Sequence, residues 1–347
     1  MYKSKLIVLL IIFIFVQGCS SGSGDESSED LSSEDYLTKA KSLADNKQYE
    51  DAIVEYTNAI EKDSSNAEAY YLRANAYALL DEYEKSIDDY TQAIELRPDV
   101  PAAFFARGYL YLFLQEHDKA LLDFDKTISM VQSNPYAYAY RGSIKLFQND
   151  LDSALEDLNI AITLDVSSDF LYVTRGRIYL AMENYTKSKA DFSRALLLNP
   201  ESTFSYYKRA QIYGLEEKYD LAIDDYSKAI ELVPENYDAL ADRGWIYLIT
   251  NQPELALNDM NLALELNPDF PHVLNNRAYV YIDLGEYQLA LDSVNEAIKI
   301  SPEAGYVDTR GDVYKAMQDS ALMCEDYRVA CDLESEISCQ KFSDNCE

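Results

Sequence analysis

An arginine recurs along this 347-residue chain at a nearly constant interval. The interval is 34 residues six times and 33 residues once, and the arginines are Arg73, Arg107, Arg141, Arg175, Arg209, Arg243, Arg277 and Arg310. A fixed period in this range is typical of proteins that stack one small structural unit, because a single unit cannot bury its own apolar face. The sequence therefore predicts one stacked domain of about 300 residues that needs no single large core.

Within each period the pattern predicts two helices. In the copy at 67–100, small or apolar residues recur every three or four positions, at Tyr70, Ala74, Tyr77 and Ala78. This spacing places them on one helical face. A second run from Ser86 to Ile94 repeats the pattern, and Pro98 ends it because proline lacks a backbone donor and disfavours helix before it. Small side chains at Ala74, Ser86 and Ala93 should let the two helices approach closely.

The period and these positions resemble the tetratricopeptide repeat, which favours small residues at positions 8, 20 and 27, aromatics near 11 and 24, and proline at 32. Counted from Ala67, the copy supplies Ala74, Ser86, Ala93, Tyr77, Tyr90 and Pro98. A divergent first copy starts near Ser33, and a ninth runs from Ala304 to about Asp332. The resemblance implies an all-α, right-handed superhelix of about nine helix-turn-helix repeats, occupying residues 36–333.

An acidic residue follows most of the arginines by sixteen positions, at Asp89, Asp123, Asp157, Asp191, Asp225, Asp259 and Asp326. Glu55 holds the place in the first copy, and Ser293 interrupts the series in the eighth. We interpret the series as structural ion pairs, within a copy or to the next, because a catalytic site would not recur so often. Tyrosines four residues after most arginines are interpreted as inter-helix packing.

The family resemblance also implies a concave groove lined by the first helix of each copy, at positions 2, 5, 9, 12 and 13. The residues that we predict to line it are Tyr71, Asn75, Phe105, Tyr109, Tyr136, Phe170, Arg177, Tyr207, Gln211, Trp245, Asn275 and Tyr279. Exposed aromatic side chains suit recognition, and we expect a protein or peptide client around copies three to seven. About half of these residues are expected to pack against neighbouring first helices instead. The family's lysine–asparagine clamp for C-terminal carboxylates is absent, since Tyr71 stands where lysine is needed.

The first residues have the composition of an export signal. Lys3 and Lys5 precede an apolar run, Leu6 to Val16, that is shorter than the ~20 residues of a membrane-spanning helix. The stretch Val16 to Cys19 resembles a bacterial lipobox, which implies a signal peptide at 1–18 and lipid on Cys19. A simply secreted protein and an uncleaved anchor are the alternatives.

Residues 19–35 are rich in serine, glycine and acid, so they predict an unstructured tether that spans roughly 20–25 Å. Ser20 after the cysteine implies the outer membrane of a diderm bacterium. The glycine and acidic residues that follow resemble the export tags of surface lipoproteins in Bacteroidetes. Whether the protein faces the periplasm or the cell surface stays open.

Four cysteines, Cys324, Cys331, Cys339 and Cys346, lie in the last 24 residues. An even cluster in an exported chain favours disulfides, and four cysteines allow three pairings. If residues 334–347 form a cap that folds back as a hairpin centred on residue 335, the pairs Cys331–Cys339 and Cys324–Cys346 are nested. The shorter pair also resembles the cysteine spacing of Sel1-like repeats. Zinc is the rival reading, but the spacings of seven, eight and seven fit no pattern of close zinc-binding pairs.

Charge and missing motifs narrow the function. With 30 basic and 61 acidic residues the net charge is −31, which disfavours nucleic acid and anionic lipid, so membrane attachment should depend on Cys19 alone. Whether the acidic surface binds calcium stays open. The two histidines, His117 and His272, are far apart, and no catalytic, metal or cofactor motif is present. We therefore predict a non-enzymatic, membrane-anchored adaptor. The alternatives are an envelope assembly factor that self-associates and an enzyme with an unrecognised site.

Overall fold

A computed structural model describes residues 31–346, and every regular element in that range is an α-helix. The predicted signal peptide, Cys19 and the tether up to residue 30 lie outside the described residues. The helices are α1 (Ser33–Asp45), α2 (Tyr49–Lys62), α3 (Ala67–Leu79), α4 (Tyr83–Leu96), α5 (Pro101–Phe113), α6 (His117–Met130), α7 (Pro135–Phe147), α8 (Leu151–Leu164), α9 (Asp169–Ala181), α10 (Tyr185–Leu198), α11 (Thr203–Leu215), α12 (Tyr219–Leu232), α13 (Tyr237–Ile249), α14 (Pro253–Leu266), α15 (Pro271–Asp283), α16 (Tyr287–Ile300), α17 (Ala304–Ala316), α18 (Ser320–Asp332) and α19 (Glu336–Cys346). Within this range no helix is long and apolar enough to cross a bilayer.

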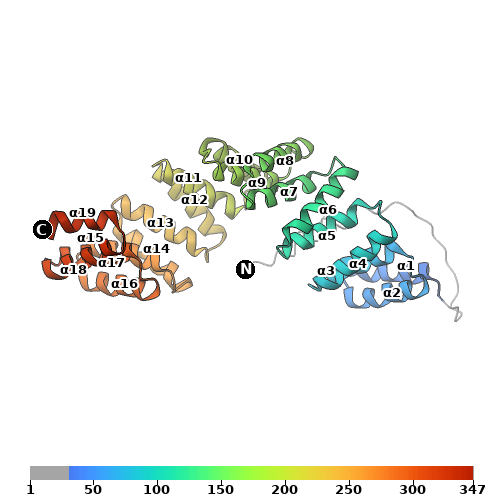
Figure 1. Ribbon diagram of the computed structural model, residues 1–347, viewed down its shortest axis with the longest axis horizontal. Helices are drawn as coiled ribbons and strands as arrows, with labels where there is room; N and C mark the ends of the chain where they lie inside the picture. The colour runs from blue at the N-terminus through green and yellow to red at the C-terminus, as the bar shows by residue number, and fades with distance from the viewer. Residues whose placement is uncertain (1–30, 347) are drawn as a thin grey trace. The chain divides into compact units, whose positions relative to one another are not determined.

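The described chain divides into two compact units, residues 31–182 and 183–346. The first holds α1 to α9 and the second holds α10 to α19, so the division falls inside the fifth repeat. In Figure 1 the helices of the first unit run from blue to green and those of the second from green to red, and successive helices form hairpins. The expected architecture of consecutive helix-turn-helix repeats is confirmed.

Local sequence sets where the helices begin. Ser32 accepts a hydrogen bond from the backbone of Asp35, whose side chain accepts in return, and this capping box starts α1 at Ser33. The first helix thus begins three residues before the predicted repeat boundary at residue 36. Asn66 and Asn134 cap α3 and α7 in the same way with their side-chain oxygens.

The turn inside each hairpin has three residues, and its middle residue has a left-handed backbone. Asp81, Gln115 and Asn149 have φ values of 61–62°, and Gly285 fills the equivalent position in the eighth repeat. A left-handed residue reverses the chain direction and satisfies the last carbonyls of the first helix. Most hairpins therefore form without a glycine in the turn. The left-handed conformation of the non-glycine residue costs about 1 kcal/mol in each of them.

Small residues bring the two helices of a repeat together, as predicted. Ala74, Ser86 and Ala93 are buried, and the Ser86 hydroxyl donates to the Ala74 carbonyl at 2.7 Å. In the fourth repeat a Cβ on Gly142 would lie 2.4 Å from Leu158 Cδ2 and 3.2 Å from the Ala154 carbonyl oxygen, so a methyl group there would require the Leu158 side chain to move. Substitution at these positions forces the helices apart.

The arginine series is confirmed as a set of structural ion pairs. In six repeats Nε and Nη2 donate to both carboxylate oxygens of the aspartate sixteen residues later, at 2.5–2.9 Å. The pairs are Arg73–Asp89, Arg107–Asp123, Arg141–Asp157, Arg209–Asp225, Arg243–Asp259 and Arg310–Asp326. Such two-pronged contacts match the guanidinium fork to the carboxylate. In the eighth repeat Arg277 donates instead to the Ser293 hydroxyl at 3.1 Å.

The same arginines also connect neighbouring repeats, which the sequence analysis did not resolve. Nη1 donates at 2.6–3.1 Å to a polar side chain on the second helix of the preceding repeat. The acceptors are Thr57, Thr91, Asp125, Asn159, Ser193, Ser227, Asn261 and Asn295. The tyrosines four residues later lie 5.7–5.9 Å from the guanidinium carbon, so they stack on the arginine of their own helix.

The C-terminal helix α19 folds back on α18. Disulfides join Cys324 to Cys346 and Cys331 to Cys339, with Cα–Cα distances of 5.7 and 4.5 Å. These are the nested pairs of the hairpin interpretation, and the two helices meet at the turn after Asp332.

Candidate binding face

In the first unit, aromatic side chains from successive first helices form a layer. The Tyr140 ring on α7 lies 5.9 and 5.3 Å from the rings of Phe105 and Tyr109 on α5. It also lies 5.4 Å from the ring of Phe170 on α9. Burial raises the pKa of both Tyr109 and Tyr140, as expected for phenols that pack between helices. Three predicted groove residues thus serve partly to join neighbouring repeats, and the sequence analysis missed Tyr140 at their centre.

Two phenylalanines on the same helices are much more exposed. Phe113 follows Phe105 by eight residues on α5, and Phe147 follows Tyr140 by seven on α7, so each shares a helical face with the layer. They are 58% and 74% exposed, although Phe113 contacts the Tyr83 ring at 4.9 Å and Phe147 contacts the His117 ring at 4.7 Å. Both occupy position 13 of their repeats, one of the expected groove positions, yet the predicted set omitted them.

The remaining predicted residues of the first unit differ in their roles. Tyr71 packs 5.7 Å from the Tyr90 ring, and Asn75 accepts a hydrogen bond from the Tyr90 hydroxyl at 2.5 Å. These two residues therefore support the second helix of their own repeat. Tyr136 is half-buried, whereas Arg177 is exposed and forms no hydrogen bond or ion pair among the described residues.

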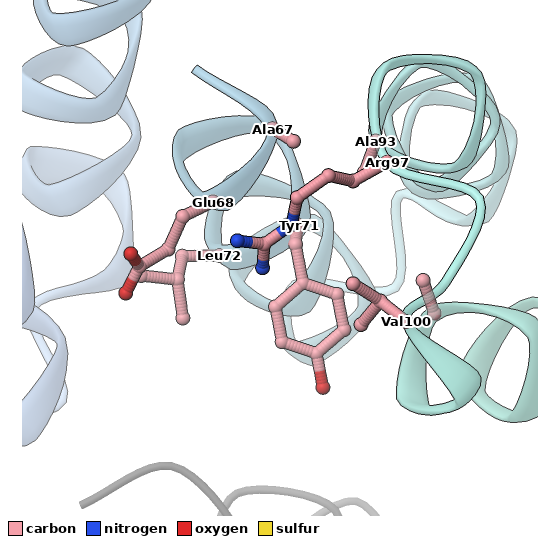
Figure 2. Close-up of a pocket in the computed structure, with 8 residues that line it drawn as sticks. Ala67, Glu68, Tyr71, Leu72, Ala93, Arg97 and Val100 are labelled. Carbon is pink, nitrogen blue, oxygen red and sulfur yellow. The ribbon is translucent and has the colours of Figure 1, made fainter. Parts of the chain in front are cut away.

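A small pocket lies beside Tyr71, between α3, the end of α4 and the start of α5 (Figure 2). Its cavity volume is about 30 Å³, enough for a few water molecules. Figure 2 shows the Arg97 side chain extending across it from the side of Ala93, toward Glu68, which is paired with Lys41 at 2.8 Å. The pocket is too small for a cofactor, and no group of three potential metal ligands occurs in residues 31–346.

In the second unit, hydrogen bonds link α11 to α13, where the first unit has ring contacts between its first helices. Gln211 on α11 donates to the Tyr207 hydroxyl at 2.9 Å and to the Asp242 carboxylate on α13 at 3.1 Å. The Tyr226 hydroxyl donates to the same carboxylate at 3.3 Å. Burial and then the charge of Asp242 raise the pKa values of Tyr207 and Tyr226. Two predicted residues, Tyr207 and Gln211, thus belong to a polar network around Asp242.

Exposed apolar side chains lie on the same two helices. Trp245, the single tryptophan, is 40% exposed on α13, and Ile249 follows it by one turn. Leu215 at the end of α11 is 64% exposed. Farther along, Tyr279 on α15 bonds to Asp312 and Thr309 of α17, while the Asn275 side-chain oxygen is buried without a partner among the described residues.

Family models described as tetratricopeptide repeats match residues 40–81, 67–100, 171–202, 204–236 and 242–305, together more than half of the chain. The chain belongs to the tetratricopeptide repeat family. The comparison with curated proteins found no match. The family accounts for the 34-residue period and for the small residues at the hairpin contact.

Several solved structures share the tetratricopeptide fold at low identity. A chain of the APC/C hetero-tetramer Cut9–Hcn1 aligns over 80% of this protein with a TM-score of 0.57 and 19% identity. Only 55% of that chain is covered, so the present protein spans about half its length. The C-terminal part of a repeat protein from Cytophaga hutchinsonii aligns with a TM-score of 0.55 and 19% identity. The alignment covers 69% of this chain and 98% of that one. Pseudomonas aeruginosa pilF aligns with a TM-score of 0.53 and 17% identity, and the alignment covers 61% of this chain and 97% of pilF.

Across the tetratricopeptide repeats the twelve predicted groove residues have several roles, each described within its own unit. Phe105, Tyr109 and Phe170 lie in the aromatic layer, and Tyr207 and Gln211 lie in the polar network. Trp245 and Arg177 present exposed surface. The exposed side chains on the first helices are Phe113, Phe147 and Arg177 in the first unit, and separately Leu215, Trp245 and Ile249 in the second.

Proposed function

We propose that this protein is a lipid-anchored adaptor that binds a protein or peptide segment on the first helices of its repeats. The observation that carries the proposal is the exposure of Phe113 and Phe147 on α5 and α7, two of the helices that carry the aromatic layer of the first unit. Fully burying one phenylalanine contributes about 1.5–3 kcal/mol, so two such contacts supply a substantial part of micromolar affinity. The ring contacts of the aromatic layer hold α5 and α7 in place, so binding on these helices needs little rearrangement.

The anchor in this proposal is a lipid on Cys19. Support comes from the sequence, where two lysines, a short apolar run and a cysteine follow in the order of a lipoprotein signal. The acidic chain would be repelled by anionic headgroups, so attachment depends on the lipid. In a diderm bacterium this arrangement would hold the repeats beside the outer membrane, in reach of envelope proteins.

The binding face can be tested by cross-linking in native membranes. The variants Phe113→Ser and Phe147→Ser should lose the captured client and keep their melting temperature. Leu122→Ser is the matched control, because Leu122 is 71% exposed in the same unit but lies on a second helix. Recognition lies elsewhere if the control loses the client equally or both phenylalanine variants retain it. Capture of a second copy alone would favour the self-associating assembly factor.

The anchor is tested separately by Cys19→Ala. This variant should move the protein from the detergent-extracted membrane fraction to the soluble fraction, because no other part of the chain supplies the acyl chains. Quantitative blotting of both fractions measures the shift. A membrane-bound Cys19→Ala protein would show that another segment provides the attachment, and it would leave the client-binding proposal intact.

A further inference from the structure

The second unit already contains one ammonium site on its first helices, and its own C-terminal helix fills it. Lys341 on α19 places Nζ 2.6 Å from the Asp308 carboxylate and 2.7 and 2.9 Å from the two carboxylate oxygens of Asp312. The same Nζ lies 5.3 Å from the centre of the Tyr327 ring. Asp312 is held by the hydroxyls of Tyr327 and Tyr279, at 2.7 and 3.3 Å. The site therefore combines two carboxylates with aromatic walls.

A carboxylate pair one turn apart, with one member held by a tyrosine hydroxyl, also occurs on α13, at positions 2 and 6 of its repeat rather than at positions 5 and 9 as on α17. Asp242 accepts from the Tyr226 hydroxyl, and Tyr226 and Tyr327 both occupy position 24 of their repeats. Asp242 also accepts from Gln211, which occupies position 9 just as Tyr279 does in its repeat. Among the described residues no lysine or arginine forms an ion pair with Asp242 or with Asp238, one turn earlier on α13.

The carboxylate pair on α13 is only partly compensated. Burial and the charge of Asp242 raise the pKa of Asp238, and Lys208 on α11 offsets part of that effect. A second cation at this position would relieve the repulsion between the two carboxylates. With a net charge of −31, the protein also favours a basic partner over an acidic one.

Apolar side chains continue the same face beyond the carboxylates. Trp245 and Ile249 lie on the next two turns of α13, and Leu215 lies at the end of α11. From Asp238 to Ile249 the helix rises roughly 16 Å, the length of about five extended residues. A tryptophan face takes both the charged head and the aliphatic stem of a basic side chain.

We propose that the α11–α13 face, formed by Leu215, Asp238, Asp242, Trp245 and Ile249, docks a segment of a partner protein that carries a lysine or arginine beside apolar residues. The basic group lies at Asp238 and Asp242 as Lys341 lies at Asp308 and Asp312, and the apolar neighbours cover Trp245 and Ile249. This inference rests on the proposed adaptor function and assigns the chemistry of a second contact region, separate from the phenylalanines of the first unit.

Trp245 reports on this face directly because the chain has no other tryptophan. The probe is a capped peptide, Gly-Leu-Ser-Lys-Leu-Leu-Gly, titrated into the full chain while indole emission is recorded. A matched peptide with norleucine for lysine keeps the four-carbon stem and removes the ammonium group, with its charge and its N–H donors. We expect the lysine peptide to shift the emission and to bind about tenfold more tightly than the norleucine peptide, as a charge-assisted hydrogen bond predicts. Added salt should reduce that difference.

The protein variants are Asp242→Asn and Asp238→Asn, with Asp224→Asn as the control of equal net charge. Asparagine at 242 still accepts from Gln211 and Tyr226, so the fold should persist, and circular dichroism checks this. Asp224 is exposed on the second helix α12, away from the network. Asp242→Asn should weaken the lysine peptide about tenfold and leave the norleucine peptide unchanged, since it removes one charge-assisted contact.

Several results would overturn the inference. One is equal affinity for the lysine and norleucine peptides. Another is wild-type affinity of Asp242→Asn for the lysine peptide. A third is a Trp245 emission that neither peptide changes. An emission that shifts with protein concentration alone would assign the face to a second copy and likewise refute a partner segment. If cross-linked client is lost in Phe147→Ser but retained in Asp242→Asn, this inference fails while the adaptor function stands. If both variants retain the cross-linked client, the adaptor function and this inference are both contradicted.

Discussion

The first helices of the two units carry different chemistry on one scaffold. In the first unit Phe105, Tyr109 and Phe170 surround Tyr140, and neighbouring repeats are joined by ring contacts. In the second unit Gln211 and Tyr226 converge on Asp242, so hydrogen bonds join the sixth and seventh repeats, and ring contacts appear farther along, between Tyr237, Phe270, His272 and Tyr306. The arginine–aspartate pairs behind both faces are the same. In this repeat the residues that hold the helices together therefore differ from the residues that a partner would contact.

The largest expected effect tests whether the scaffold is equally strong in both units. Arg107→Ala leaves the Asp123 carboxylate, whose side chain is 7% exposed, buried without its cation, and this should lower the free energy of unfolding by about 3–5 kcal/mol. Arg277→Ala removes two hydrogen bonds, to Ser293 and Asn261, and the stack on Tyr281, but it leaves no buried carboxylate without a cation, so about 1–2 kcal/mol is expected. Urea titration followed by circular dichroism measures both.

The interrupted pair in the eighth repeat provides the control for that comparison. In a Ser293→Asp background, Arg277→Ala should become as costly as Arg107→Ala, because the new carboxylate then loses its partner. Equal costs for Arg107→Ala and Arg277→Ala in the natural background would mean that the arginines act through packing on their tyrosines rather than through charge.

The next effect distinguishes the two kinds of contact between repeats. Tyr140→Ala removes the ring shared by α5, α7 and α9 and should cost about 3 kcal/mol, as for other large aromatic truncations. Tyr226→Phe removes one hydroxyl from Asp242 and should cost about 1 kcal/mol. Amide hydrogen exchange locates each loss within its unit. Faster exchange in α10 to α19 for Tyr140→Ala would contradict a local role for the aromatic layer.

The scaffold was largely predictable from the sequence, whereas the binding face was not. The 34-residue period, the small residues and the aspartates sixteen positions after the arginines are each repeated, so neighbouring copies reinforce one reading. The acceptors in the preceding repeat vary between threonine, serine, asparagine and aspartate, which hid their common role. Their shared register, sixteen residues before the arginine in most copies, was the available signal.

The position of a residue within the repeat did not determine whether its side chain is exposed. Phe105 and Phe113 lie on one face of α5, yet the first packs under Tyr140 and the second remains mostly exposed. That difference depends on the side chains of adjacent repeats, which vary from copy to copy. Asp242 shows the same limit, because its role follows from Tyr226 and Gln211, which belong to the preceding repeat.

The smallest effect concerns the charge on the second face. Burial and the neighbouring Asp242 raise the pKa of Asp238 in the folded protein, so the folded state binds a proton more readily than the unfolded state. Stability contributed by this group therefore falls as pH rises through its raised pKa and is regained on acidification. Asp238→Asn should raise the melting temperature slightly at pH 7. That gain should vanish at a pH below the ordinary aspartate range, because both proteins are then neutral at position 238. Scanning calorimetry at the two pH values, with Asp224→Asn as the exposed control, measures the difference. A gain that is the same at both pH values would show that the carboxylate at 238 is not strained by Asp242, and the second face would then have no unmet need for a cation.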